Sequence, residues 1–323
     1  MNMLAIFSRD LEKGSTKYRL AQYLDYFKSK GLYVKLVNRD SVNKSLIKQV
    51  SEFDILLNQR YLFNYSLSRK LIEQSKRVIF DFDDAIYTRP GKPHSFITGL
   101  RVKKRMHLWL KRSDAVTTSN MFLSEYAEKY SKSVKTIPMS LDLEQWKPNE
   151  IKSGNNIVLG WTGSPVNVKL IEQLDDVLSL LLKKYPFVKL AVFSGQKPKL
   201  NCPFDYKPFQ PGLEPAFVQS IDIGLLPLID EEYYRGKSPI KAIQYIACGI
   251  PVVGNIIGAT REILNDENSI GVSNKKEWIE ALEKLILNKN LINTMGAAGR
   301  IHAEKKFNFT TVAQDYFNVI SGI

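Results

Sequence analysis

The chain has 323 residues, of which 44% are hydrophobic, and this is enough to fill the cores of two domains of ordinary size. No run of about 18 apolar residues occurs, so no membrane-spanning helix is expected. In the first ten residues, MNMLAIFSRD, the apolar run is too short and charged residues follow too soon for a signal peptide, so the pattern favours a first strand. The net charge is +13, and residues 1–150 carry +11 of it, so the first half should attract anionic partners.

Cysteine usage fits a reduced compartment. The two cysteines, Cys202 and Cys248, lie far apart in the sequence and lack metal-ligand spacing, and the three histidines are scattered. The cysteines therefore fit a cytoplasmic protein, and nothing supports a histidine-based metal site.

In the first half, apolar runs alternate with amphipathic segments. This pattern is typical of a parallel sheet that has helices on both faces. Strands are expected at Leu4–Ser8, Tyr33–Val37, Asp54–Asn58, Val78–Asp83, Ala115–Thr118 and Val134–Pro138. The polar stretch WKPNEIKSGNN then predicts a domain boundary, which divides the chain into domains 1–148 and 149–308.

The second half repeats the alternation. Strands are expected at Ile157–Trp161, Lys189–Ser194, Ile223–Leu228, Pro251–Val253 and Ile270–Val272. The last segment, 309–323, has Val312, Tyr316, Phe317 and Ile320 on one side, which predicts a packed helix. The fold class is therefore α/β, with two Rossmann-like domains of similar size.

Two acidic residues follow the strand in VIFDFDD. Asp83 and Asp84 stand at its carboxyl end, where parallel sheets tend to place functional groups. They could accept hydrogen bonds from sugar hydroxyls, act as a base, or bind Mg²⁺. Helix capping by either side chain is the alternative interpretation.

A glycine-containing loop follows the first strand, at Gly14-Ser15-Thr16-Lys17. It could bring backbone close to a ligand, although an ordinary strand–helix turn explains it equally well.

Residues 100–112, LRVKKRMHLWLKR, predict a basic amphipathic helix. Its apolar stripe consists of Val102, Met106, Trp109 and Leu110. The surrounding basic residues are Arg101, Lys103, Lys104, Arg105, Lys111 and Arg112. The stripe could pack on the sheet with its charges in water, or the basic face could meet an anionic membrane surface, and both can hold together.

The run 223–258 carries the most informative pattern. An apolar strand leads through a polar loop to a predicted helix, 238–248, with Ser238 as its cap and Gly249 at its end. Lys237, Ser238 and Lys241 cluster at the start of this helix, where backbone N–H groups and ammonium groups could hold a phosphate. The alternative is that both lysines point into water.

A second glycine-containing turn occurs in IVLGWTGSPVNVK. A strand delivers Gly160–Gly163, and Ser164 and Pro165 start a helix that should run to about Lys184. A glycine at this place allows backbone to approach a diphosphate closely.

The segment AIQYIACGIPVVG resembles the donor-site segment of family 4 retaining glycosyltransferases, which have the GT-B fold. The family pattern has two glutamates eight positions apart, which fall here on Gly236 and Gln244. Ser164 stands where the family has an arginine, and Lys169 lies near a family lysine. The resemblance implies two domains facing across a cleft, with the last helix, 309–323, crossing back to the first.

The resemblance also implies an activity. This is transfer of a hexose, without a metal ion or other cofactor, from a nucleotide-diphosphate sugar to a glycan or lipid-linked acceptor in cell-surface polysaccharide synthesis, with retention of configuration. A non-catalytic nucleotide- or nucleic-acid-binding protein and a GT-B-type sugar-nucleotide epimerase are the alternatives. No interleaved aromatic and basic platform for nucleic acid occurs. The expected location is cytoplasmic, with peripheral contact at the inner face of the membrane.

Site residues follow from this resemblance together with the motifs. The catalytic, acceptor-side residues are Asp83 and Asp84, and Lys237 is expected to supply the charge of the missing arginine. The donor-binding residues are Gly163, Ser164, Lys169, Lys237, Ser238, Lys241 and Gln244. The acceptor-binding residues are Ser15, Lys17 and Arg19.

Overall fold

The structure is a computed structural model that describes residues 1–8, 10–12, 14–149 and 155–322. The chain forms two compact units. The first consists of Met1–Met139, Glu231–Ser238 and Thr310–Ile323, and the second of Ser140–Asp230 and Pro239–Phe309. The chain therefore passes to the second unit after Met139, earlier than the predicted boundary at residue 148. Part of the polar stretch predicted to join the domains, residues 150–154, lies outside the described residues.

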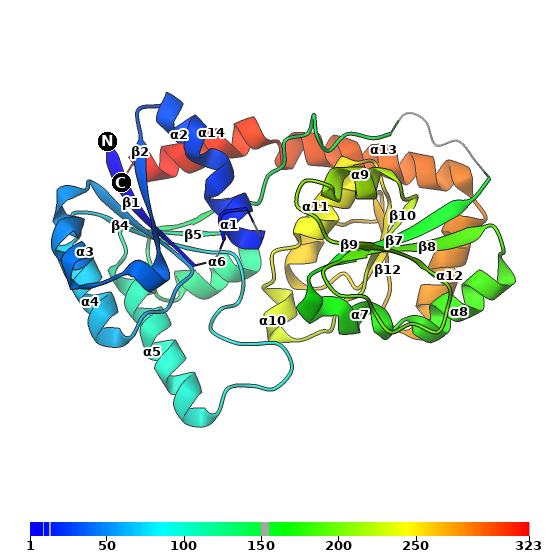
Figure 1. The fold of residues 1–323 in the computed structure, drawn as a ribbon, viewed down its shortest axis with the longest axis horizontal. Coiled ribbons are helices and arrows are strands. Elements are labelled where there is room, and N and C mark those ends of the chain that lie inside the picture. The colour runs from blue at the N-terminus through cyan, green and yellow to red at the C-terminus, as the bar shows by residue number, and fades with distance from the viewer. Residues whose placement is uncertain (9, 13, 150–154, 323) are drawn as a thin grey trace. The chain divides into compact units, whose positions relative to one another are not determined.

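The first unit contains a parallel sheet of six strands in the order β2-β1-β3-β4-β5-β6, with helices on both faces (Figure 1). The strands are β1 (Asn2–Phe7), β2 (Tyr33–Asn38), β3 (Ile55–Gln59), β4 (Val78–Phe82), β5 (Ala115–Thr118) and β6 (Val134–Thr136). Every residue of β3, β4 and β5 is buried, because helices cover both faces of a parallel sheet. This double burial explains the continuous apolar runs in the sequence.

Helices of the first unit are mostly short. They are α1 (Gly14–Arg19), α2 (Leu24–Ser29), α3 (Lys44–Gln49), α4 (Tyr65–Gln74), α5 (Phe96–Arg112), α6 (Met121–Glu128) and α10 (Glu232–Arg235), with α14 (Phe309–Ser321) returning at the end of the chain.

The second unit has the same architecture, with strand order β12-β11-β10-β7-β8-β9, all parallel (Figure 1). The strands are β7 (Ile157–Gly163), β8 (Val188–Ser194), β9 (Asp205–Pro208), β10 (Ile223–Leu226), β11 (Val252–Gly254) and β12 (Ser269–Gly271). The helices are α7 (Val168–Glu172), α8 (Asp175–Lys184), α9 (Glu214–Gln219), α11 (Ile240–Ala247), α12 (Lys275–Ile286) and α13 (Lys289–Lys306). Two Rossmann-like units confirm the predicted fold class.

The basic helix predicted from residue 100 is α5, and it begins four residues earlier than expected. Met106, Trp109 and Leu110 are fully buried, and Val102 packs against the same core. The Trp109 indole N–H donates to Ser68 Oγ at 3.1 Å. The packing interpretation of the apolar stripe is therefore confirmed.

The last helix, α14, packs on the first unit. Tyr316 is fully buried, and its ring meets the rings of Tyr23 and Phe27 edge-on, at centroid distances of 5.5 and 5.7 Å. Tyr26 Oη donates to Gln314 Oε1 at 2.6 Å. The predicted return of the chain end to the first domain is confirmed, although Ile323 lies outside the described residues.

Within the described ranges, no helix is both long enough and apolar enough to cross a lipid bilayer.

Candidate functional site

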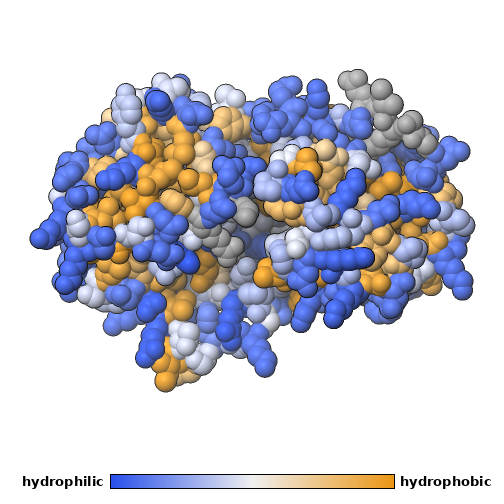
Figure 2. Space-filling model, in the orientation of Figure 1, coloured by the Kyte–Doolittle hydropathy of each residue, from blue (hydrophilic) through white to orange (hydrophobic). Residues whose placement is uncertain are grey.

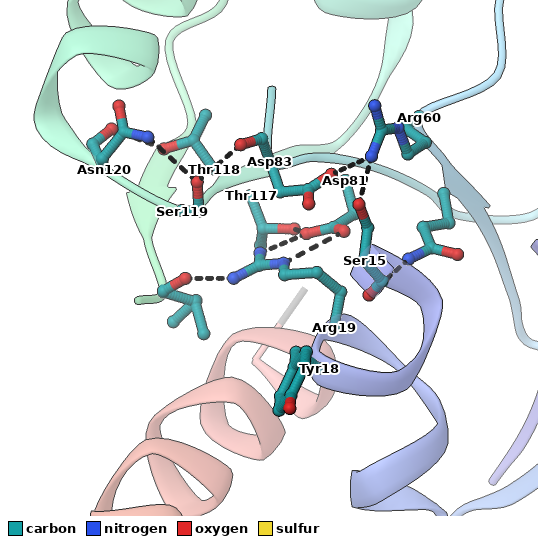
Figure 3. A network of polar contacts seen from close by, with 12 residues as sticks. Ser15, Tyr18, Arg19, Arg60, Asp81, Asp83, Thr117, Thr118, Ser119 and Asn120 are labelled. Carbon is teal, nitrogen blue, oxygen red and sulfur yellow. Dashed lines mark hydrogen bonds and ion pairs between the residues drawn. The ribbon is translucent and has the colours of Figure 1, made fainter. Parts of the chain in front are cut away.

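The carboxyl ends of β1, β3 and β4 bring four polar side chains together in the first unit. They are Ser15, Arg60, Asp83 and Asp84, of which Figure 3 labels the first three. The sheet order changes direction between β1 and β3. Parallel α/β sheets bind ligands at such a switch point, beyond the carboxyl ends of the strands. The topology therefore makes this cluster the candidate site of the first unit.

Arg60 joins the cluster. Its Nη1 lies 3.0 Å from Asp83 Oδ1 and also donates to Ser15 Oγ, while Nη2 donates to Asp84 Oδ2 at 2.8 Å. Among the described residues, Arg60 is the one non-glycine with positive φ, 52°. That conformation costs on the order of 1–2 kcal/mol, so the surrounding contacts must hold it. Arg60 was not among the residues predicted for the site. The polar Asn58 and Gln59 that end the apolar run of β3 were the available signal.

The two predicted catalytic carboxylates differ in exposure and pKa. The Asp83 side chain is 1% exposed and that of Asp84 is 14% exposed. Burial raises the pKa of Asp83 to about 6, against the opposing charge of Arg60. Burial would also raise the pKa of Asp84, but Arg60, Lys237 and the Ser238 N–H together lower it. Asp84 is therefore the ionised, accessible member of the pair.

The segment Glu231–Ser238 belongs to the first unit and contacts this cluster. The Ser238 backbone N–H donates to Asp84 Oδ1 at 3.3 Å. The Lys237 ammonium lies over the rings of Tyr233 and Tyr234, 6.0 and 5.7 Å from their centroids, and its charge contributes to the lowered pKa of Asp84. Lys237 and Ser238 are thus placed beside Asp84 by their own unit.

Ser238 does not cap the following helix, and that prediction was wrong. Helix α11 begins at Ile240, and its N-cap residue is Pro239, which offers no side-chain cap. The backbone N–H of Ser238 instead donates a hydrogen bond to Asp84 Oδ1. The reason is tertiary, because the Asp84 carboxylate, two residues after β4 ends, accepts the Ser238 N–H.

Gly236 stands where the resembled pattern has its first glutamate, and it has no room for a side chain. A Cβ atom there would lie 2.9 Å from Ala85 Cβ and 3.0 Å from Leu123 Cδ2. Asn120 Nδ2 also donates to the Gly236 carbonyl at 3.4 Å. Packing within the first unit therefore requires glycine at this position. The acidic side chain beside this segment is that of Asp84, which accepts from the Ser238 N–H.

Arg19, predicted to bind an acceptor, is instead fully buried. Its guanidinium donates to both carboxylate oxygens of Asp81 and to the Ile137 carbonyl (Figure 3). Thr117 Oγ1 also donates to Asp81, at 2.7 Å. The acceptor-binding prediction for Arg19 was wrong, because an aspartate 62 positions along the chain holds it inside the unit.

The other two predicted acceptor residues are half-buried. The Ser15 hydroxyl accepts from Arg60, and the Ser15 carbonyl accepts from Gln59 Nε2 at 3.2 Å. The Lys17 ammonium lies over the Tyr18 ring, 5.7 Å from its centroid. Their role toward an acceptor stays a prediction.

In the second unit, the glycine turn lies at the carboxyl end of β7, beside β10, where the sheet order reverses. A Cβ at Gly163 would lie 2.3 Å from Trp161 Cζ2, so the turn requires glycine. Ser164 is exposed and accepts from Asn167 Nδ2 at 2.9 Å. The helix predicted from Pro165 to Lys184 is broken into a 3-10 turn (Pro165–Asn167), α7 and α8.

The predicted donor residues divide between the two units. Lys169 is exposed on α7, Lys241 is partly exposed on α11, and Gln244 is buried on α11. These three belong to the second unit with Gly163 and Ser164, whereas Lys237 and Ser238 belong to the first. Their common role in donor binding stays a prediction. Within the described part of the chain, no three or more His, Cys, Asp or Glu side chains are grouped so that they could hold a metal ion.

Part of the chain is similar to known glycosyltransferases. Residues 156–288 match the model of the family described as "Glycosyl transferases group 1". The second unit therefore contains a glycosyltransferase group 1 domain. A Bacillus subtilis (strain 168) protein named as a candidate teichuronic acid biosynthesis glycosyltransferase, TuaH, is 23% identical over 172 residues. That alignment spans 48% of this chain and 43% of the relative, so less than half of either protein is matched.

Solved structures match over the full length. Sucrose-phosphate synthase from Thermosynechococcus elongatus has a TM-score of 0.77, with 100% of both chains covered and 14% identity. Anabaena HepE in complex with UDP and glucose has a TM-score of 0.75, with the same coverage and identity. At this identity the likeness shows the fold alone, which is GT-B. The resemblance to GT-B glycosyltransferases is confirmed by the fold and the family match together, and so is the predicted enzyme class, at the level of the group 1 domain.

Proposed function

We propose that the protein transfers a sugar from a nucleotide-diphosphate sugar, with retention, to a glycan or lipid-linked acceptor in cell-surface polysaccharide synthesis. The match of residues 156–288 to the group 1 glycosyltransferases carries this proposal. The UDP and glucose named for HepE support the class of donor, and the name of TuaH supports the class of acceptor. A cytoplasmic location and independence of a cofactor remain predictions.

The donor diphosphate would meet backbone and ammonium groups. The Gly163 turn at the end of β7 admits close backbone approach, since no side chain fits there. Lys169, Lys237 and Lys241 would supply positive charge to the departing diphosphate, the electrostatic work that a metal ion does elsewhere. This charge set is the reason for proposing metal-independent transfer.

The two aspartates would have different roles. Asp84 is accessible and ionised, so it is suited to accept a hydrogen bond from an acceptor hydroxyl. Asp83 is too buried to touch a substrate, and we assign it the positioning of Arg60. Asp84 also stands beside Ser238, two residues after the glycine that replaces the glutamate of the resembled pattern.

The experiment screens the full chain against UDP-, GDP-, ADP- and CMP-sugars by thermal shift, because a ligand selective for the native state raises its melting point. Consumption of the stabilising nucleotide sugar is then measured with and without glycan and lipid-linked acceptors. Faster consumption with an acceptor is expected. Binding without consumption would show a non-catalytic binding protein, and interconversion of the sugar without an acceptor would show an epimerase.

Two variants separate the proposed roles. Asp84→Asn should lower acceptor-dependent turnover by about 100-fold or more while leaving the donor Kd nearly unchanged. Lys237→Ala should raise the donor Kd by roughly tenfold or more, because a charge-assisted bond contributes ~1.5–3 kcal/mol. The exposed Lys289 in the second unit provides the matched control, and Lys289→Ala should alter neither quantity. An unchanged Kd in Lys237→Ala would remove Lys237 from the donor site.

A further inference from the structure

The first turns of α5 carry three exposed apolar side chains. Phe96, Ile97 and Leu100 are 80%, 61% and 53% exposed, although apolar side chains of this size are usually buried. These turns project beyond the rest of the first unit, and apolar atoms gather at their end (Figures 1 and 2). We call these three residues the α5 tip.

The α5 tip is separate from the buried stripe of the helix. Phe96 and Leu100 are four residues apart, and Lys103 and Lys104 follow at helical spacing on the same side. The buried Met106 and Trp109 lie on the other side and pack in the core. The apolar tip therefore continues the solvent-facing, basic side of α5 rather than its core-facing side.

The chain segment that carries the tip is basic, although the Gly91 N–H in the preceding loop donates to the Glu231 carboxylate. Residues 85–113 contain no Asp or Glu and eight Lys or Arg residues. Arg101, Lys103 and Lys104 are exposed directly after the tip. The Lys104 ammonium lies over the exposed ring of Tyr65, the first residue of α4, at 4.7 Å from its centroid. A tyrosine ring beside lysines is also typical of the membrane–water interface.

We propose that the α5 tip inserts into the interfacial region of an anionic lipid bilayer, with Arg101, Lys103 and Lys104 against lipid headgroups. Charge complementarity favours a lipid surface, because apolar insertion and basic contacts are the two signals that together anchor a peripheral protein. A second copy of this chain would present an equally basic face, and repulsion between like charges opposes pairing of the two copies through the α5 tip. Three side chains also provide too little area for a stable protein partner. The proposal is independent of sugar transfer.

Vesicle sedimentation of the full chain tests the proposal. Vesicles of phosphatidylcholine alone are compared with an equal mixture of phosphatidylcholine and phosphatidylglycerol. The wild type should bind the mixed vesicles, bind phosphatidylcholine weakly, and lose affinity as salt is raised. Arg101→Gln with Lys103→Gln should weaken binding roughly 25-fold, about fivefold for each charge. Phe96→Ser with Leu100→Ser should weaken it roughly tenfold or more.

Matched controls come from the second unit. Leu287 and Ile301 are each 66% exposed, and Lys284 and Lys289 are exposed lysines. Leu287→Ser with Ile301→Ser, and Lys284→Gln with Lys289→Gln, should leave vesicle binding unchanged. Circular dichroism establishes that each variant is folded.

Three results would overturn the proposal. The first is equal binding to both kinds of vesicle, and the second is equal loss in the tip variants and their controls. The third is a lipid-free dimer of the wild type that Phe96→Ser with Leu100→Ser converts to monomer, which would show that a second copy covers the tip.

Discussion

Replacing Arg60 by alanine should strongly destabilise the first unit. The variant removes the guanidinium whose nitrogens lie 3.0 Å from Asp83 Oδ1 and 2.8 Å from Asp84 Oδ2. Asp83 then remains in the interior as a charge without its counterion. Breaking a buried ion pair on one side typically costs about 3–5 kcal/mol. We expect Arg60→Ala to lower the unfolding free energy of the first unit by an amount in this range at about pH 7.5.

The loss of unfolding free energy in Arg60→Ala should depend on pH, and the protonation of Asp83 determines the direction of that dependence. Its folded-state pKa is raised from 3.8 to about 6, so its contribution to stability is fully present below pH 3.8 and is lost as pH rises through about 6. The shift corresponds to about 3 kcal/mol between the two protonation states. Without Arg60 the pKa rises further, and a protonated Asp83 needs no counterion. The destabilisation by Arg60→Ala should therefore be smaller at about pH 5 than at about pH 7.5.

Hydrogen exchange of β4 and β5 peptides, measured by mass spectrometry at both pH values, reports the free energy of opening of the first unit. Arg69→Ala is the matched control, because Arg69 pairs with Glu73 on the surface at 2.6 Å and should contribute about 0.5 kcal/mol or less. Adding Asp83→Asn to Arg60→Ala should recover part of the loss. A loss below about 1 kcal/mol, or an equal loss at both pH values, would refute the reasoning.

Three further results are expected. Arg60→Gly should be about 1 kcal/mol less destabilising than Arg60→Ala in the same exchange assay, because glycine adopts positive φ at little cost; equal losses would show that the backbone there carries no strain. Gly163→Ala should lower the unfolding free energy of the second unit by about 1–3 kcal/mol, since the new methyl group would meet the Trp161 ring, whereas Ser164→Ala should be nearly neutral. Urea unfolding distinguishes these two variants. Tyr316→Ala should lower the unfolding free energy of the first unit by about 3–5 kcal/mol and speed hydrogen exchange throughout α14. Tyr316→Phe keeps the ring and should lower it by about 1 kcal/mol or less. Slow exchange of α14 in Tyr316→Ala would contradict the packing of α14 through this ring.

Most strands could be predicted because parallel strands buried on both faces leave a local signal. β3 and β4 each begin with three apolar residues, ILL and VIF, and eleven of the twelve strands in the described residues coincide with predicted ones. The exception is β9, a largely exposed edge strand with the sequence DYKP, which has no apolar run to detect. Local burial thus makes an element predictable, and exposure at a sheet edge removes the signal.

Site chemistry was only partly accessible from sequence. The acidic pair after β4 and the glycine turn after β7 were found, because polar or glycine residues directly after a buried strand stand out. The pairing of Arg60 with that acidic pair could not be found. It depends on which strands are neighbours in the sheet and on a backbone conformation that arginine rarely adopts.

The sequence by itself determined the two Rossmann-like domains, the existence of the apolar stripe of α5 and the place of the acidic pair, because each leaves a periodic or strand-end pattern within one short segment. Only the tertiary structure decided that Arg19 is an interior partner of Asp81, and that residues 231–238 belong with the first unit beside Asp84. Those outcomes follow from contacts between segments far apart in the chain, and no local pattern records which of several nearby charges a buried group will meet.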